Sequence, residues 1–127
     1  MTSQQPNQAQ VVAAVCAVME VAAADLPGKT TPRTRPRLQW ARNMAAFVMH
    51  DLGMPDGAIA RTFGGIHRIT IMVRRRRMAE KLETTQRYRD HHLEILKRLA
   101  AEQAGEQHRI AAAAHGARTV EQFAPYP

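Results

Sequence analysis

Eleven basic side chains gather in the middle of this 127-residue chain, and the chemistry they offer most directly is the binding of a polyanion. Residues 27–77 carry eleven Lys and Arg against two Asp, a net charge of +9, whereas the remainder carries seven basic and nine acidic residues, a net charge of −2. Nucleic acid is the commonest polyanion in a cytoplasm. The alternative is a solvated basic face that keeps the protein soluble, and the uneven distribution favours nucleic acid.

Residues that could support catalysis or bind a metal ion are few. Cys16 is the only cysteine and lies in an apolar stretch, so we expect a buried structural thiol rather than a nucleophile or a zinc ligand. Ser3 is the only serine and lies at the start of the chain, where it cannot serve a catalytic triad. The six histidines lack the spacing of a zinc site. The sequence therefore predicts a protein that is not an enzyme and has no metal ion and no cofactor.

Binding to a nucleotide or a membrane is not expected either. Gly28-Lys29-Thr30 is similar to the end of a phosphate-binding loop, but Ala23 replaces the glycine that this motif requires, and no strand precedes it. The apolar run over 11–24 is interrupted by Glu20 and is shorter than the ~20 residues that cross a bilayer. We therefore predict a cytoplasmic protein, associated with the nucleoid.

Helical patterns dominate the chain. Frequent Ala and Met, with only six aromatic residues, favour an all-α fold. Pro32 and Pro36 disfavour a helix over 29–37 and leave an extended basic connector there. Apolar residues at three- and four-residue steps predict the helices 8–24, 38–52, 57–63 and a last one from 66 or 67 to 82 that could continue to 99. The predicted organisation is a disordered start (1–7), a helical DNA-binding domain (8–103) and a partly disordered C-terminal extension (104–127).

The segment 57–82 has the pattern of a helix-turn-helix. A short helix is followed by the sharp break Gly64-Gly65 and by a helix whose first turn carries polar residues. In a helix-turn-helix the second helix enters the major groove of DNA, where each base pair presents its own set of donors and acceptors. A plain helical hairpin has similar spacing.

A resemblance to a known family adds to this pattern. The stretch Ala41-Arg42-Asn43-Met44-Ala45-Ala46-Phe47-Val48-Met49-His50-Asp51-Leu52, followed by Phe63-Gly64-Gly65, resembles the C-terminal DNA-binding domain of the bacterial replication initiator DnaA. The resemblance spans roughly residues 11–82. It implies a helix-turn-helix domain of the DnaA C-terminal type, here as a stand-alone protein with an additional C-terminal helix, from a bacterium, a plasmid or a phage.

The resemblance also implies roles for single residues. Arg42 and the connector before it correspond to the region of that family that enters the minor groove. The first turn of the last helix places His67, Arg68 and Ile69 at base edges, with Thr70, Arg61 and Arg74 near phosphates. The family's Asp-His-Thr trio is replaced by His67-Arg68-Ile69, so we expect weak binding to the initiator's own box. The predicted DNA-binding residues are Arg33, Arg35, Arg37, Arg42, Arg61, Gly65, His67, Arg68, Ile69, Thr70, Arg74 and Arg75.

The function expected from these features is binding to double-stranded DNA with sequence preference, in the regulation of transcription or replication. The alternative is a protein-binding adaptor or an anti-initiator that acts through the long C-terminal helix. Residues 82–100 could also form a homodimer, or could fold back on the first helix to complete a monomeric core.

Overall fold

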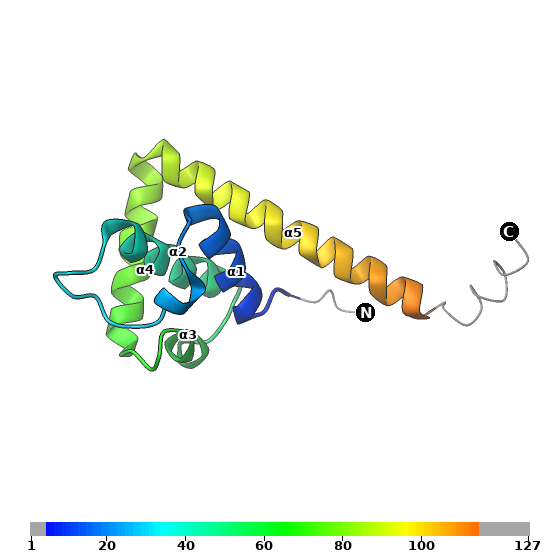
Figure 1. Cartoon of the computed structure of the whole chain (residues 1–127), viewed down its shortest axis with the longest axis horizontal. Coiled ribbons are helices and arrows are strands. Elements are labelled where there is room, and N and C mark those ends of the chain that lie inside the picture. Colours follow the sequence, from blue (N-terminus) through cyan, green and yellow to red (C-terminus); the bar gives the residue numbers. More distant parts are fainter. Residues whose placement is uncertain (1–4, 115–127) are drawn as a thin grey trace, which may run out of the picture.

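Five α-helices and one short 3-10 turn form the regular structure of residues 5–114 (Figure 1). This computed structural model describes the backbone of residues 5–114 and the side chains of residues 5–105. The all-α prediction is confirmed, and no strand occurs between residues 5 and 114. The elements are α1 (Gln8–Met19), η1 (Ala23–Asp25), α2 (Pro36–Asp51), α3 (Asp56–Thr62), α4 (Arg68–Thr84) and α5 (Gln86–Ala114).

The first helix is fixed by side-chain and backbone features at its two ends. Asn7 caps α1, with its side chain accepting from the Gln10 N–H while the Gln10 side chain accepts from the Asn7 N–H, both at 2.9 Å. Glu20 adopts a left-handed conformation (φ 59°) and ends the helix. The predicted end near Ala24 is therefore wrong, because Glu20 turns the chain into η1.

The second helix begins earlier than its apolar pattern predicts. Pro36 occupies the first helical turn, where its missing N–H costs no hydrogen bond, so α2 includes Arg37. The basic connector consequently ends at Arg35. It is not fully extended, because Thr31 and Thr34 form a turn in which the Thr34 N–H donates to the Thr31 carbonyl at 3.0 Å.

The connection between α3 and α4 turns where the glycine pair predicts it. Gly64 and Gly65 have φ of 83° and 85°, a region that side chains with a Cβ rarely adopt. Phe63, just before them, is fully buried. His67 then caps α4, because its Nδ1 accepts from the Ile69 N–H at 3.0 Å.

The last helix completes the core. α4 ends at Thr84, and Thr85 is extended (φ −130°), so the chain turns into a separate helix instead of continuing. α5 then runs along α1, with Ile95 and Leu99 buried in the same cluster as the apolar residues of α1 and α2 (Figure 1). Of the two arrangements left open by the sequence, the one in which this segment completes a monomeric core is present.

The ends of the chain are described in part. α5 continues through Ala104 and Gly105, across the predicted boundary between the helical domain and the C-terminal extension, and it extends beyond the other helices (Figure 1). Residues 1–4 of the predicted disordered start, and residues 115–127 of the predicted extension, lie outside the described residues. Within the described residues, no helix is long and apolar enough to cross a membrane.

Candidate nucleic-acid interface

The outer face of α4 carries basic and apolar side chains together. Four exposed residues follow the i, i+3, i+4, i+7 spacing that defines one face of a helix. They are Ile69, Met72, Val73 and Arg76. Arg68 and Arg77, which are also exposed, flank this line on its two sides. No acidic residue occurs from residue 68 to residue 79, so the first three turns of α4 present only positive charge.

The start of α4 lies beside the connector. The Gly28 N–H donates to the Phe63 carbonyl at 3.1 Å, which ties the segment before the connector to the end of α3. A depression of about 580 Å³ lies between the connector and the start of α4. It is lined by Lys29, Thr30, Gly65, Ile66, His67 and Thr70. The predicted residues Gly65, His67 and Thr70 therefore lie together beside Lys29. Gly65 and His67 are exposed, and Thr70 is half-buried.

Arg68 has an acidic neighbour that the sequence did not reveal. Its Nε lies 3.4 Å from the Asp56 Oδ2 at the first turn of α3. Asp56 lies inside the first turn of α3, and Pro55 occupies the cap position. The Arg68 side chain is 76% exposed and that of Asp56 32%, so solvent screens the pair and its contribution to stability is small, but the Arg68 side chain is directed towards α3.

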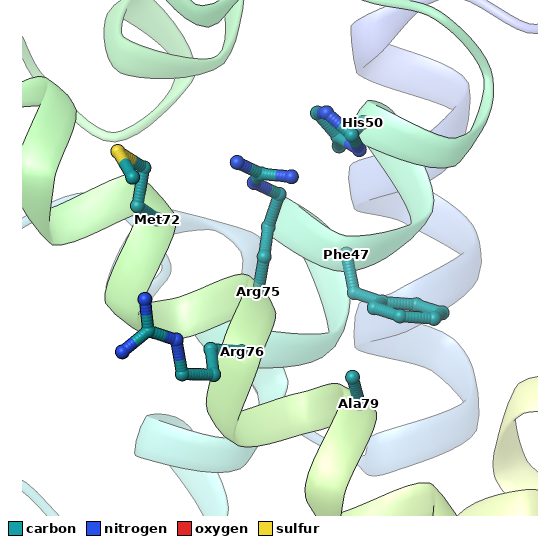
Figure 2. Close-up of a pocket in the computed structure, with 6 residues that line it drawn as sticks. All are labelled: Phe47, His50, Met72, Arg75, Arg76 and Ala79. Carbon is teal, nitrogen blue, oxygen red and sulfur yellow. The ribbon is translucent and has the colours of Figure 1, made fainter.

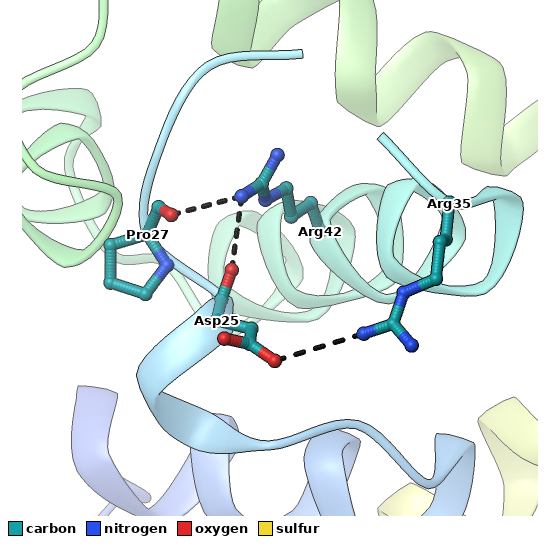
Figure 3. Close-up of polar contacts among 4 residues, drawn as sticks. All are labelled: Asp25, Pro27, Arg35 and Arg42. Atoms are coloured by element: carbon teal, nitrogen blue, oxygen red, sulfur yellow. Dashed lines mark hydrogen bonds and ion pairs between the residues drawn. The ribbon is translucent and has the colours of Figure 1, made fainter. Parts of the chain in front are cut away.

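The connector exposes the arginines that the sequence assigned to it. Arg33 and Arg35 lie on the connector itself, and Arg37 lies on the first turn of α2; all three are exposed. Arg35 is within 3.9 Å of the Asp25 carboxylate, and both side chains are more than half exposed (Figure 3). Arg61 is also exposed, on α3. These four arginines are therefore accessible to a ligand.

Arg42 is not available to a groove of DNA, which corrects the expectation drawn from the resemblance. Its side chain is 5% exposed and points into the fold. Its guanidinium donates to the carbonyls of four residues at 2.8–3.2 Å, and Figure 3 shows two of these bonds. The four acceptors are Asp25, Leu26, Pro27 and Lys29. Arg42 therefore holds the base of the connector in place.

The contacts of Arg42 with this segment also explain why position 28 is a glycine. Gly28 has a φ of 125°, and a Cβ built there would lie 3.0 Å from an Arg42 Nη2. A side chain at this position would therefore strain the backbone and displace the guanidinium at once.

Arg74 is the second correction, because it is buried and cannot contact phosphate. Its side chain is 1% exposed, its Nη2 donates to the Gly28 carbonyl at 3.0 Å, and its guanidinium lies 4.6 Å from the centre of the Phe63 ring. Its Nε and Nη1 have no hydrogen-bond partner among the described residues. Burial, and then the charge of Arg42, lower the pKa of Arg74 to about 10.

The burial of Arg74 has a signal in the sequence that was missed. Arg74 stands three residues after Ile71 and four before Met78, both of which are fully buried. It therefore shares the inward face of α4 with them. Within the run 74–77, Arg76 and Arg77 are exposed and Arg75 is half-buried.

A small pocket separates the outer faces of α2 and α4. It has a volume of about 240 Å³ and is lined by Phe47, His50, Met72, Arg75, Arg76 and Ala79. Figure 2 shows the Arg75 side chain extending from α4 towards the side on which His50 lies. None of the lining residues is acidic, so the positive face of α4 continues onto this side of the molecule.

Other groups that could do chemistry are isolated. Cys16 is buried in α1, and burial raises the pKa of its thiol, which suits a structural residue. Among the residues that the structure describes, no three His, Cys, Asp or Glu gather closely enough to hold a metal ion. The exposed basic face of α4 and the neighbouring connector are therefore the strongest candidate for a functional surface. Comparison with protein-family models and with curated proteins finds no match for this chain.

Proposed function

We propose that this protein binds double-stranded DNA, and that α3, the turn over 63–67 and α4 act as a helix-turn-helix with the outer face of α4 in the major groove. The observation that carries the proposal is the composition of that face. It exposes Arg68, Arg76 and Arg77, and it lacks any acidic residue over three turns. The major groove is wide enough to accept a helix, and positive side chains neutralise the phosphates on its two sides.

The connector supports this orientation. Because Gly28 is tied to Phe63, the chain leaves for the connector beside the first turn of α4. An arginine-bearing segment in that place can reach the backbone or the minor groove next to the major groove that α4 occupies. The arginines proposed for this role are Arg33, Arg35 and Arg37, without Arg42.

We propose further that the protein regulates transcription or replication as a DnaA-like, stand-alone DNA-binding domain. The stretch 41–52 and Phe63-Gly64-Gly65 carry the resemblance, and both lie in elements that pack directly against α4 or lead into it. The altered first turn of α4, with Arg68 and Ile69 exposed, supports a target other than the initiator's box, because side chains at the groove edge decide which bases are preferred.

A second candidate is an adaptor or anti-initiator that binds a protein, or a second copy, through α5. It is favoured by one observation: Leu93 and Leu96 remain exposed on α5 although Ile95 and Leu99 of the same helix are buried. Scattered exposed apolar residues are normal on protein surfaces, however, so the basic face of α4 carries more weight.

Selection of bound duplexes from a random pool, at about 150 mM salt where non-specific phosphate contacts are weakened, tests the proposal. We expect an enriched motif that changes when the selection is repeated with Arg68→Ala. Asp56→Asn is the matched variant: it removes the carboxylate beside Arg68, so affinity should rise where Arg68→Ala lowers it. Recovery of no duplex would reject the proposal and favour the α5 candidate. Loss of duplex binding in Leu93→Glu but not in Arg68→Ala would also reject the proposal and favour that candidate.

A further inference from the structure

We infer that α4 recognises thymine-rich duplexes by placing Ile69, Met72 and Val73 against the 5-methyl groups of thymines in the major groove. This inference rests on the proposed function, because it names the chemistry that the same helix face would read. It concerns the apolar residues of that face, which binding to phosphate alone does not use.

The first observation is the exposure of three apolar side chains in one patch. Ile69 is 62% exposed, Met72 39% and Val73 38%. They follow one another at i, i+3 and i+4, so they form a continuous patch on one side of the helix. None of them belongs to the hydrophobic core, and each is free to contact a ligand.

The second observation is the charge that surrounds the patch. Arg76 continues the line of the three apolar residues at i+7, and Arg68 and Arg77 flank it. An apolar protein partner would have to bury these guanidinium groups, which is costly without paired carboxylates. In the major groove, the phosphates on the two sides can pair with the arginines, while methyl groups on the floor of the groove contact the apolar side chains. The patch therefore complements a major groove with methyl groups on its floor.

The chemistry of base edges narrows the target. In the major groove, the thymine methyl is the apolar group by which a protein distinguishes thymine from other bases, whereas adenine and cytosine are usually read by amide or carboxylate side chains. The exposed face from Arg68 to Arg77 has neither an amide nor a carboxylate. Its apolar residues therefore select thymine, and its arginines can donate to guanine or to phosphate oxygens.

The dimensions also agree. Seven residues separate Ile69 from Arg76, and a helix rises about 1.5 Å per residue, so the line covers roughly 10 Å. Bases along one strand follow each other at about 3.4 Å, so this length corresponds to roughly three base pairs. Ile69 and Val73 are β-branched and have few rotamers in a helix, so they lose little side-chain entropy when they meet the methyl groups.

Deoxyuridine provides a direct test, because it retains the pairing edge, the O4 acceptor and the phosphate charge of thymidine and lacks only the methyl group. A fluorescent duplex enriched by the selection above is prepared with thymidine and with deoxyuridine at its thymine positions. Its affinity for the full chain is then measured by anisotropy at about 150 mM salt. We expect the thymine duplex to bind about four-fold more tightly for each methyl group contacted.

Two variants connect the effect to α4. Ile69→Ala should lower the thymine-to-uracil affinity ratio, and it should fold normally because the side chain is largely exposed. Leu93→Ala, which removes an exposed leucine of α5 from a position outside this face, should leave the ratio unchanged.

Each outcome decides a different question. Equal affinity for the thymine and uracil duplexes, or an enriched motif without thymine, would overturn the inference while leaving DNA binding intact. An unchanged ratio in Ile69→Ala would overturn the assignment to this face of α4. Failure of every duplex to bind would instead reject the proposed function, and the inference with it.

Discussion

Arg42 of α2 and Arg74 of α4 reach the same short segment of chain, and between them they donate to five successive carbonyls. Arg42 binds those of Asp25, Leu26, Pro27 and Lys29, and Arg74 binds that of Gly28. These hydrogen bonds are buried at Leu26 and partly buried at the other four residues, and this irregular segment has no neighbouring strand to supply donors. Two arginines that look like DNA ligands in the sequence are thus structural, and they position the connector beside α4.

Replacing Arg42 should reduce stability more than it reduces the charge available for DNA. Arg42→Met removes donors from one buried and three partly buried carbonyls, and an acceptor left unpaired away from water costs free energy, so we expect a loss of about 2–4 kcal/mol in the free energy of unfolding. Urea denaturation followed by circular dichroism measures this loss. Arg37→Met on the same helix is exposed and serves as control, with a change within about 0.5 kcal/mol. Similar losses in the two variants would contradict the role given to Arg42.

Arg74→Met should behave differently from Arg42→Met. Arg74 is buried, and the charge of Arg42 acts on it unfavourably. Its favourable interactions are one hydrogen bond and its contact with the Phe63 ring. Exchanging a buried charge for an apolar side chain of similar size is often neutral or stabilising, so we expect a change within about 1 kcal/mol at pH 7.

The pH dependence of this variant gives a second readout. The pKa of Arg74 is lowered to about 10 in the folded protein, so above that pH the unfolded chain holds more protons than the folded one. This group therefore destabilises the fold at neutral pH, and its penalty decreases as the pH rises through about 10. Urea unfolding at neutral and at alkaline pH should show the wild type gaining stability relative to Arg74→Met. A constant difference across this range would contradict the prediction.

His92 should make the fold sensitive to mild acid. Its ring packs edge-on against Phe47, with centroids 5.5 Å apart, where α5 meets α2. Burial lowers the pKa of His92 below its ordinary value of 6.5, although the charge of Asp51 partly opposes this. As the pH falls through 6.5 the unfolded chain takes up the proton first, so stability should be full above that pH and should decrease below it.

His92→Phe keeps an aromatic ring against Phe47 and removes the titration. Its melting temperature should therefore fall less than that of the wild type between neutral and mildly acidic pH. His50→Gln, at an exposed position of α2, is the control and should retain the wild-type slope. If the wild type and His92→Phe lose the same stability on acidification, another group is responsible.

The two faces of α5 should respond very differently to truncation of their side chains. Ile95 is fully buried in the common core, so Ile95→Ala should cost about 2–4 kcal/mol. Leu93→Ala, at a position that is 54% exposed, should change stability by less than about 0.5 kcal/mol. Thermal unfolding of the two variants checks this. Equal effects, or a melting temperature that depends on protein concentration, would indicate that α5 forms a seam between two copies.

The parts of the fold that the sequence predicts well are those with a strong local signal. Glycines that must adopt positive φ mark the turn before α4, and the apolar spacing marks four of the five helices of the described chain. The end of α1 and the bend at Thr85 have no such signal, because they depend on single backbone conformations within favourable helical patterns.

The candidate site is harder to predict, because identical residue types occupy opposite environments. Arginines in the basic region divide between exposed positions and buried ones that bind carbonyls, and composition alone does not separate them. For Arg74 the helical register could have done so. For Arg42 and for the Arg68–Asp56 pair, the partner lies on another element and becomes visible only in the folded chain.

The most direct test of DNA binding through α4 is the salt dependence of affinity for a duplex in the wild type and in two matched arginine variants. Arg76 is exposed on the outer face of α4, whereas Arg98 is an exposed arginine on α5, paired with Glu94 at 3.6 Å. Anisotropy titrations over a range of salt concentrations should show that Arg76→Ala weakens binding and reduces the slope of log K against log salt by about one. Arg98→Ala should leave both unchanged. Equal effects of the two substitutions, or none from Arg76→Ala, would contradict the assignment of α4 as the DNA-binding helix.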